Sequence, residues 1–241
     1  MAMKKTHDPA TGVFISHKRL DRLLTGLMTK QYPLLEFADT TDVERALPHI
    51  FEAFDVYPSE FVRSLIFMVE LRKRVGIKGR EVGGYAPWKG ICISGIGREA
   101  EGVWLAHMVH HELAHHVSKK GFRKRVRKEW LELNGDAEYI GYDEYFRRSE
   151  AGLLPSEEDV ADLGFLESYG MASIEEDFAT IAAAIMTWGP EFWQEAKHYK
   201  TLRNKAFIVL RVYELVDKRM TLEWFGFEIV KNDEVVGTGE A

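Results

Sequence analysis

The sequence contains a single cysteine, Cys92. One thiol excludes an internal disulfide framework and every zinc site built from several thiolates, so nitrogen and oxygen atoms would have to hold a metal. Cys92 lies in a predicted strand, and we expect it to pack in the core rather than act as a nucleophile.

The sequence also lacks an excess of positive charge. It has 32 Lys and Arg residues against 38 Asp and Glu residues, which gives a net charge of -6. This balance gives no global attraction to nucleic acids or anionic membranes. The basic stretch "KKGFRKRVRK" (119–128) has no interleaved aromatic residues, so we interpret it as a solvated helix face, with an acidic substrate or partner as the alternative.

Long apolar runs are missing as well. The most apolar stretch, "FATIAAAIMTW", is far shorter than the ~20 residues that span a bilayer. The first residues lack the apolar segment of a secretory signal, which leaves a cytoplasmic protein or a trimmed, exported bacterial protein. The hydrophobic content of 46% is ample for a core, and we expect a monomer.

Apolar periodicity and turn residues predict a mainly helical chain with a small sheet. Pro48 is expected to kink or shorten the second helix, and 142–154 is expected to be a loop that shapes specificity. Strands are expected at 81–86 and 90–94, with a C-terminal hairpin around Asn232 and Asp233. Helices are expected at 18–29, 41–57, 59–76, 98–118, 122–133, 156–167 and 174–188, and a packed helix pair is expected at 190–218.

The segment "HELAH" contains the candidate metal ligands and the candidate general base. His111 and His115 are four residues apart, so on a helix both imidazoles can reach one zinc ion. Glu112 points about 100° away round the axis, where it can act as general base on a water bound to that ion. The alternative is a buried helix whose histidines bond to backbone carbonyls, and we prefer it for the neighbouring His107, His110 and His116.

A third ligand must come from elsewhere, because catalytic zinc sites usually have three protein ligands and one open position. His198 is the one histidine in the C-terminal half, whereas Glu175, Glu176 and Asp177 open an apolar helix. Ser173 and Glu176 also form a capping box, in which Glu176 would merely reach back to the Ser173 amide. From the residues alone, both roles of Glu176, metal ligand and helix cap, stay open.

"HELAH" followed by Tyr-x6-Glu-Asp-Phe-Ala resembles a family of zincin peptidases. The family includes the catalytic domain of anthrax lethal factor, the pro-Pro endopeptidases and bacterial "putative zinc-binding metallopeptidases". The resemblance implies that Glu176 is the third zinc ligand and that Tyr169 stabilises the oxyanion. Glu175 and Asp177 are then the fallback ligands.

The resemblance spans about residues 83–186. Within it, "VGGYAPWKGICIS" is similar to the edge strand that binds an extended substrate, which implies substrate contacts at Gly84, Tyr85, Ile91 and Ile93. The sequence departs from the family at Thr180, where relatives carry an acid that orients a ligand histidine.

Together these features predict an α+β, mainly helical, zincin-like metalloprotease fold. Residues 1–241 are expected to form one catalytic domain, with an N-terminal lobe of about 1–120 and a C-terminal lobe of about 121–241. The expected function is a zinc (Zn2+) metalloendopeptidase of the gluzincin type that acts on a peptide or protein substrate. The alternatives are a catalytically silent zinc-binding effector or interaction module of the same fold and a metal-free helical protein.

Overall fold

The computed structural model describes residues 6–7, 14–16, 34–38, 40–77, 80–96, 102–225, 227–230 and 234–237. The chain divides into two compact units, Met1–His116 and Val117–Ala241, and the boundary falls inside one helix, α4 (Gly102–Gly121). As predicted, the fold is α+β and mainly helical. No helix among the described residues has both the length and the apolar character needed to cross a membrane.

The first unit contains a mixed sheet whose centre is β4. The strands β2, β4 and β7 run parallel, while β1 pairs antiparallel with β2 and β6 pairs antiparallel with β7, in the order β1-β2-β4-β7-β6. Two further strands, β3 and β5, pair with β4. The bounds are β1 Thr6–His7, β2 Phe14–Ser16, β3 Leu34–Phe37, β4 Met68–Ile77, β5 Arg80–Glu81, β6 Gly84–Tyr85 and β7 Gly90–Ile93.

The helix predicted over 59–76 is wrong in its second half. Helix α3 covers only Ser59–Leu65, and the residues that follow it form β4. Successive strand residues point to opposite faces, and β4 buries Val69 and Leu71 on one face and the ion-paired Glu70 and Arg72 on the other. The sequence does alternate here, with apolar residues at 69, 71, 75 and 77, but Phe61, Leu65 and Val69 are also spaced four apart, which favoured a continued helix.

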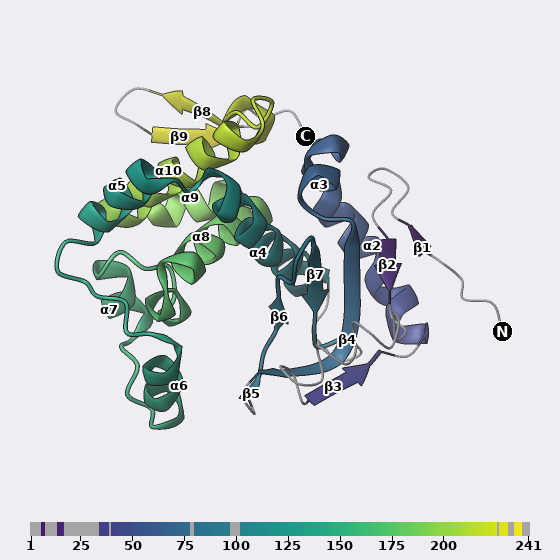
Figure 1. Cartoon of the computed structure of the whole chain (residues 1–241). Coiled ribbons are helices and arrows are strands. Elements are labelled where there is room, and N and C mark those ends of the chain that lie inside the picture. The colour runs from purple at the N-terminus through teal and green to yellow at the C-terminus, as the bar shows by residue number, and fades with distance from the viewer. Residues whose placement is uncertain are drawn as a thin grey trace. The chain divides into compact units, whose positions relative to one another are not determined.

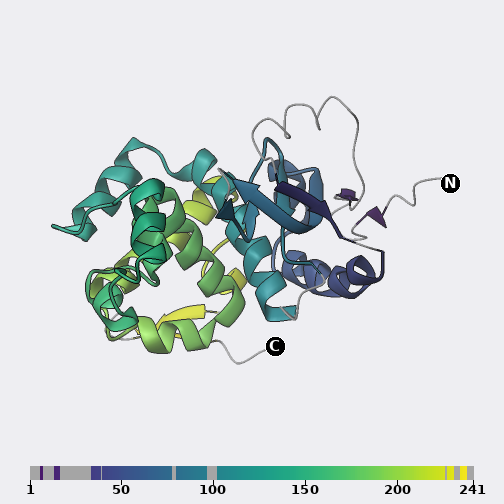
Figure 2. The same cartoon turned by 90° about the horizontal axis from the view of Figure 1, so that it is seen from below.

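Helices α2 (Thr40–Asp55) and α4 lie on the same side of this sheet (Figure 2). A Cβ atom at Gly102, at the start of α4, would lie 2.6 Å from the ring of His49 in α2. Helix α2 continues through Pro48, so the predicted shortening is wrong. Pro48 is exposed, and water can satisfy the carbonyl that loses its helical partner.

The second unit is built from helices around α8 (Ile174–Trp188), which coincides with the predicted helix at 174–188. Figure 1 shows α8 beside α9 and α10, with α5 nearby. All residues of α8 from 176 to 185 are buried, so it is the core helix of this unit. The other helices are α5 Lys124–Asn134, α6 Tyr142–Glu150, α7 Glu157–Asp162, α9 Pro190–Ala196 and α10 Lys200–Val216, with 3-10 helices η1 Ser168–Ala172 and η2 Glu223–Phe225.

Some boundaries in this unit differ from the expectation. The segment expected as a loop contains α6, a polar helix without a buried residue, in which Glu144 pairs with Arg147 and Arg148. The sequence of α6 has no apolar periodicity from which a helix could be predicted. The helix expected at 156–167 is shorter. The helix pair expected at 190–218 is confirmed by α9 and α10, and β8 (Phe227–Val230) and β9 (Glu234–Gly237) confirm the hairpin. The helix expected at 18–29 lies outside the described residues.

Candidate metal centre

The two histidines of "HELAH" face one another along α4. The ring centroids of His111 and His115 are 5.0 Å apart, with the planes at 81°. This follows from the helical repeat, which places residues four apart on one face. His111 is buried and His115 is half-buried. The helix alone therefore brings two imidazoles into position to share one ion.

Two of the neighbouring histidines have partners in the core, a backbone carbonyl for His116, as predicted, and a tyrosine hydroxyl for His110. His110 Nδ1 is 2.8 Å from the Tyr57 hydroxyl, and His116 Nε2 is 2.7 Å from the Gly90 carbonyl oxygen. Burial and then the charge of His107 lower the pKa of His110 to about 3. Burial and then His111 lower the pKa of His107 to about 4. Both side chains are therefore neutral at pH 7.

Glu112 is buried where α4 packs against the sheet. A Cβ atom at Gly84 on β6 would lie 2.6 Å from Glu112 Oε1 and 2.7 Å from the backbone oxygen of Cys92. Real Cβ atoms do not approach other atoms so closely, so the backbone of β6 rests directly on the carboxylate. Gly84 is required by this close approach.

Glu176 lies in the first turn of α8. The Ser173 side chain caps this helix by accepting a hydrogen bond of 3.2 Å from the Glu176 amide. The carboxylate of Glu176 is engaged elsewhere, because the Tyr142 hydroxyl of α6 donates a bond of 2.6 Å to its Oε1. Burial, and then the charge of Glu176, raise the pKa of Tyr142, which keeps its hydroxyl protonated as a donor.

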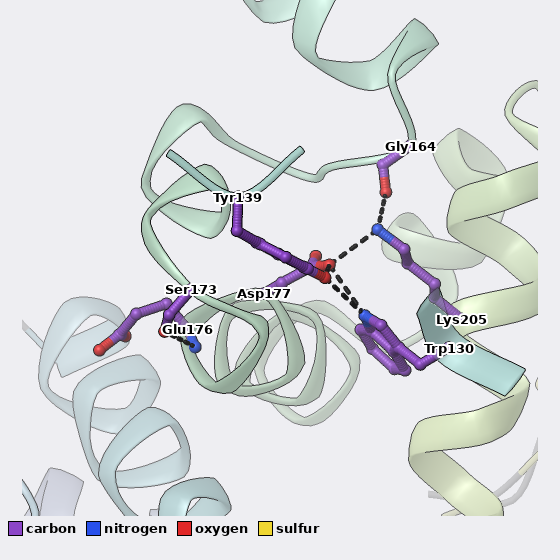
Figure 3. Close-up of polar contacts among 7 residues, drawn as sticks. All are labelled: Trp130, Tyr139, Gly164, Ser173, Glu176, Asp177 and Lys205. Carbon is purple, nitrogen blue, oxygen red and sulfur yellow. Dashed lines mark hydrogen bonds and ion pairs between the residues drawn. The ribbon is translucent and has the colours of Figure 1, made fainter. Parts of the chain in front are cut away.

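The two fallback ligands have other partners. Glu175 is exposed and forms an ion pair of 2.6 Å with Arg127. Asp177 is fully buried and binds Lys205 at 2.7 Å, on a different side of α8 from the Glu176 carboxylate (Figure 3). Burial raises the pKa of Asp177 and lowers that of Lys205, while the contact between them opposes both shifts.

His111, His115 and Glu176 form a group that can hold a metal. One possible ligand atom from each lies within 4.8 Å of the others. Two imidazole nitrogens and one carboxylate oxygen are a donor set of catalytic zinc sites, so the residues fit the ion expected from the sequence. Tyr142, which contacts this group, was missed because a tyrosine in a polar segment 34 residues earlier carries no sequence signal.

The comparisons with known proteins identify a family. The profile of the family described as "Putative zinc-binding metallo-peptidase" matches residues 97–221, more than half of the chain. The chain belongs to this family. A search of curated proteins finds no match.

A solved structure is similar in fold. It is the crystal structure of a putative zinc-binding metallo-peptidase from Bacteroides caccae, with a TM-score of 0.50 and 15% sequence identity. The likeness covers 86% of this chain and 85% of that chain. At this identity it supports the α+β, mainly helical fold and nothing finer.

Most of the predicted substrate-binding side chains lie in the core. Ile91 and Ile93 are fully buried on β7, which is paired on both sides, by β4 and β6. Tyr85 is buried as well, and its hydroxyl lies 3.4 Å from Glu70 Oε2. Cys92 packs against Tyr85 and Val75, as expected of a core cysteine, and burial raises its pKa. In the order of the described strands β6 is the last, so backbone pairing with a substrate would involve β6.

Two other predicted positions lie close to Glu176 in the chain. Tyr169 lies on η1, directly before α8, and its ring contacts that of Tyr145 at 5.3 Å. Thr180 follows Glu176 by one turn and is buried, and its hydroxyl has no hydrogen-bond partner in the part of the chain that the structure describes. The basic stretch 119–128 is largely exposed, which confirms that it is a solvated surface.

Proposed function

We propose that this member of the metallo-peptidase family is a zinc-dependent endopeptidase of the gluzincin type. The observation that carries the proposal is the proximity of His111, His115 and Glu176, whose possible ligand atoms lie within 4.8 Å of one another. Three protein ligands leave one position open for water or substrate. Zinc bound there would polarise the scissile carbonyl and lower the pKa of water towards ~7.

Glu112 is the proposed general base. It follows His111 directly, and its carboxylate is buried against the backbone of β6 at Gly84. It takes a proton from the attacking water as the new C–O bond forms. It then passes the proton to the amine nitrogen as the C–N bond breaks. Its buried position favours this role because little bulk water competes for the proton.

Tyr169 is proposed to support the reaction from η1. By the resemblance to the lethal factor family, its phenol donates a hydrogen bond to the negative charge that develops on the carbonyl oxygen. Tyr142 has a different role in this proposal. Its bond of 2.6 Å to Glu176 Oε1 orients the carboxylate that would bind the ion.

The proposed substrate is an extended peptide or protein segment that pairs with the backbone of β6 near Gly84 and Tyr85. Main-chain pairing suits this strand because its own side chains contribute little exposed surface. We propose that residues 1–241 act as one catalytic domain in a monomer. Neither nucleic acid nor a membrane has a place in this proposal.

A silent zinc-binding module is the second candidate. The observation in its favour is Thr180, a buried residue at the position where the resemblance predicts an acid. A neutral threonine cannot stabilise an imidazole N–H as a carboxylate does. Zinc binding without hydrolysis is what this candidate predicts.

The test has two parts. Zinc is measured in protein purified without chelators, and a diverse peptide library is then incubated with the wild type and with Glu112→Gln. We expect one zinc ion per chain and cleavage by the wild type that falls at least about 100-fold in the variant. The matched control is Glu132→Gln, the same change at an exposed position of α5.

The outcomes separate the candidates. Zinc without cleavage by either protein supports the silent module, and cleavage retained in Glu112→Gln refutes the proposed general base. If the purified protein contains no zinc, the proposal is refuted, and the metal-free helical protein is the interpretation that remains.

A further inference from the structure

Asp177 follows Glu176 in the first turn of α8, and its side chain is fully buried. A single oxygen, Oδ2, accepts three hydrogen bonds, from Lys205 Nζ at 2.7 Å, from the Tyr139 hydroxyl at 2.7 Å and from Trp130 Nε1 at 3.0 Å (Figure 3). The donors come from α10, from the segment before α6 and from α5. The start of α8 is thus tied to three separate parts of the second unit.

Lys205 is also fully buried. Besides Asp177, its ammonium group donates to the Gly164 carbonyl oxygen at 2.7 Å, and it lies 4.3 Å from the ring centroid of Phe165 and 5.5 Å from that of Trp130. Such an ion pair is a poor way to gain stability, because removing two charges from water offsets much of their attraction. Well-packed apolar residues would stabilise the unit at least as well. Its presence points to a role in fixing one conformation.

The side chain that needs a fixed conformation is Glu176. The first turn of a helix frays more easily than its middle, because its amides lack helical partners. Neighbouring residues in a helix point about 100° apart, so holding Asp177 from one side sets the direction of Glu176 on another. Ser173 caps the same turn at the Glu176 amide (Figure 3).

We infer that the buried network of Asp177, Lys205, Tyr139 and Trp130 positions Glu176 for metal binding. The network never contacts the ion in this inference; it acts through the backbone of the first turn of α8. The inference rests on the proposed function, in which Glu176 is a ligand.

The test compares zinc affinity with stability in the full chain. Lys205→Met removes the cation at nearly equal length, and Tyr139→Phe removes a single hydroxyl, so it serves if the first variant does not fold. The zinc dissociation constant is measured by competition with a chromophoric chelator, well below the unfolding temperature. We expect both variants to raise it roughly 10-fold, the lower end of the effect of groups that orient ligands.

The matched control is Val209→Ala. Val209 is fully buried on α10, one turn after Lys205, and belongs to no part of the network. Its truncation leaves a cavity, so it lowers the unfolding temperature. We expect its zinc dissociation constant to stay that of the wild type. The inference is overturned if Val209→Ala weakens zinc binding as much as Lys205→Met does when the two variants lose the same amount of unfolding temperature.

A double variant and a ligand variant complete the design. Asp177→Asn with Lys205→Met removes both charges and should recover part of the unfolding temperature lost in Lys205→Met, without recovering zinc affinity. If zinc affinity returns together with stability, the network is only structural. Glu176→Ala separates the two claims: wild-type zinc affinity there refutes the ligand set of the proposed function. Lost affinity in Glu176→Ala, with wild-type affinity in Lys205→Met and Tyr139→Phe, refutes the positioning inference alone.

Discussion

His111 and His115 lie one turn apart on α4, and their mutual placement needs only the repeat of that helix. Glu176 lies at the start of α8, and the groups that hold it come from far along the chain. Tyr142, which binds its carboxylate, is 34 residues away, and the donors to Asp177 are 28 to 47 residues away. Two of the proposed ligands are thus placed by local geometry and the third by long-range contacts, so the two regions should respond differently to mutation.

Gly84→Ala tests whether the α4 region is as independent as its helical repeat suggests. The new Cβ atom would lie 2.6 Å from Glu112 Oε1 and 2.7 Å from the Cys92 backbone oxygen, so the strand or the carboxylate must move. A displacement of about 1 Å can cost about 100-fold in rate. We expect kcat/KM in peptide cleavage to fall by that amount while the zinc dissociation constant, measured by chelator competition, changes little.

The control for this variant is Gly90→Ala on the adjacent strand β7. There the nearest atom to a new Cβ is the Met68 backbone oxygen at 3.2 Å, and no part of Glu112 is among the close neighbours. Its activity should exceed that of Gly84→Ala clearly. Full activity in Gly84→Ala would mean that the position of Glu112 does not depend on β6.

The same division explains what could be predicted from the sequence. Helix α8 and the pair His111 and His115 follow from apolar periodicity and a spacing of four, which are properties of neighbouring residues. Glu176 could be proposed as a ligand only with the help of a family resemblance. Its own neighbours suggested a cap equally well, and the Ser173 bond to its amide is indeed present.

Two elements, β4 and α6, were missed for different reasons. Strand β4 pairs with four other strands. Its buried Glu70 and Arg72 neutralise one another, and charged residues are not expected from sequence in a central strand. Helix α6 buries no residue and is held by pairs among its own charges. Helix α6 has no apolar period, whereas the alternation of β4 follows residues at helical spacing that favoured a helix. With α6 the contact of Tyr142 was missed too.

Tyr142→Phe tests the dependence of the α8 region on distant groups. The change removes the hydroxyl that donates to Glu176 Oε1 at 2.6 Å and keeps the ring. Loss of a group that orients a ligand typically costs about 10–100-fold in metal affinity, and because Tyr142 is partly exposed we expect roughly 10-fold. Chelator competition measures the effect.

Tyr145→Phe is the matched control, since it changes a tyrosine of the same helix whose ring contacts that of Tyr169 edge-on. We expect its zinc affinity to be that of the wild type. Should Tyr142→Phe also bind zinc as tightly as the wild type, Glu176 is placed by the first turn of α8 alone, and the comparison between the two regions weakens.

The smallest effect is expected for Glu175→Gln, which tests whether Glu175 or the adjacent Glu176 is the metal ligand at the start of α8. Glu175 is exposed and paired with Arg127 at 2.6 Å, and such surface pairs contribute at most about 1 kcal/mol to the free energy of unfolding. Denaturant titration should show a loss no larger than this, and the zinc dissociation constant should not change. A weakened zinc affinity would mean that Glu175 is a ligand in solution. The third ligand would then depend on the presence of several acids in the first turn of α8, and not on the contacts that direct Glu176.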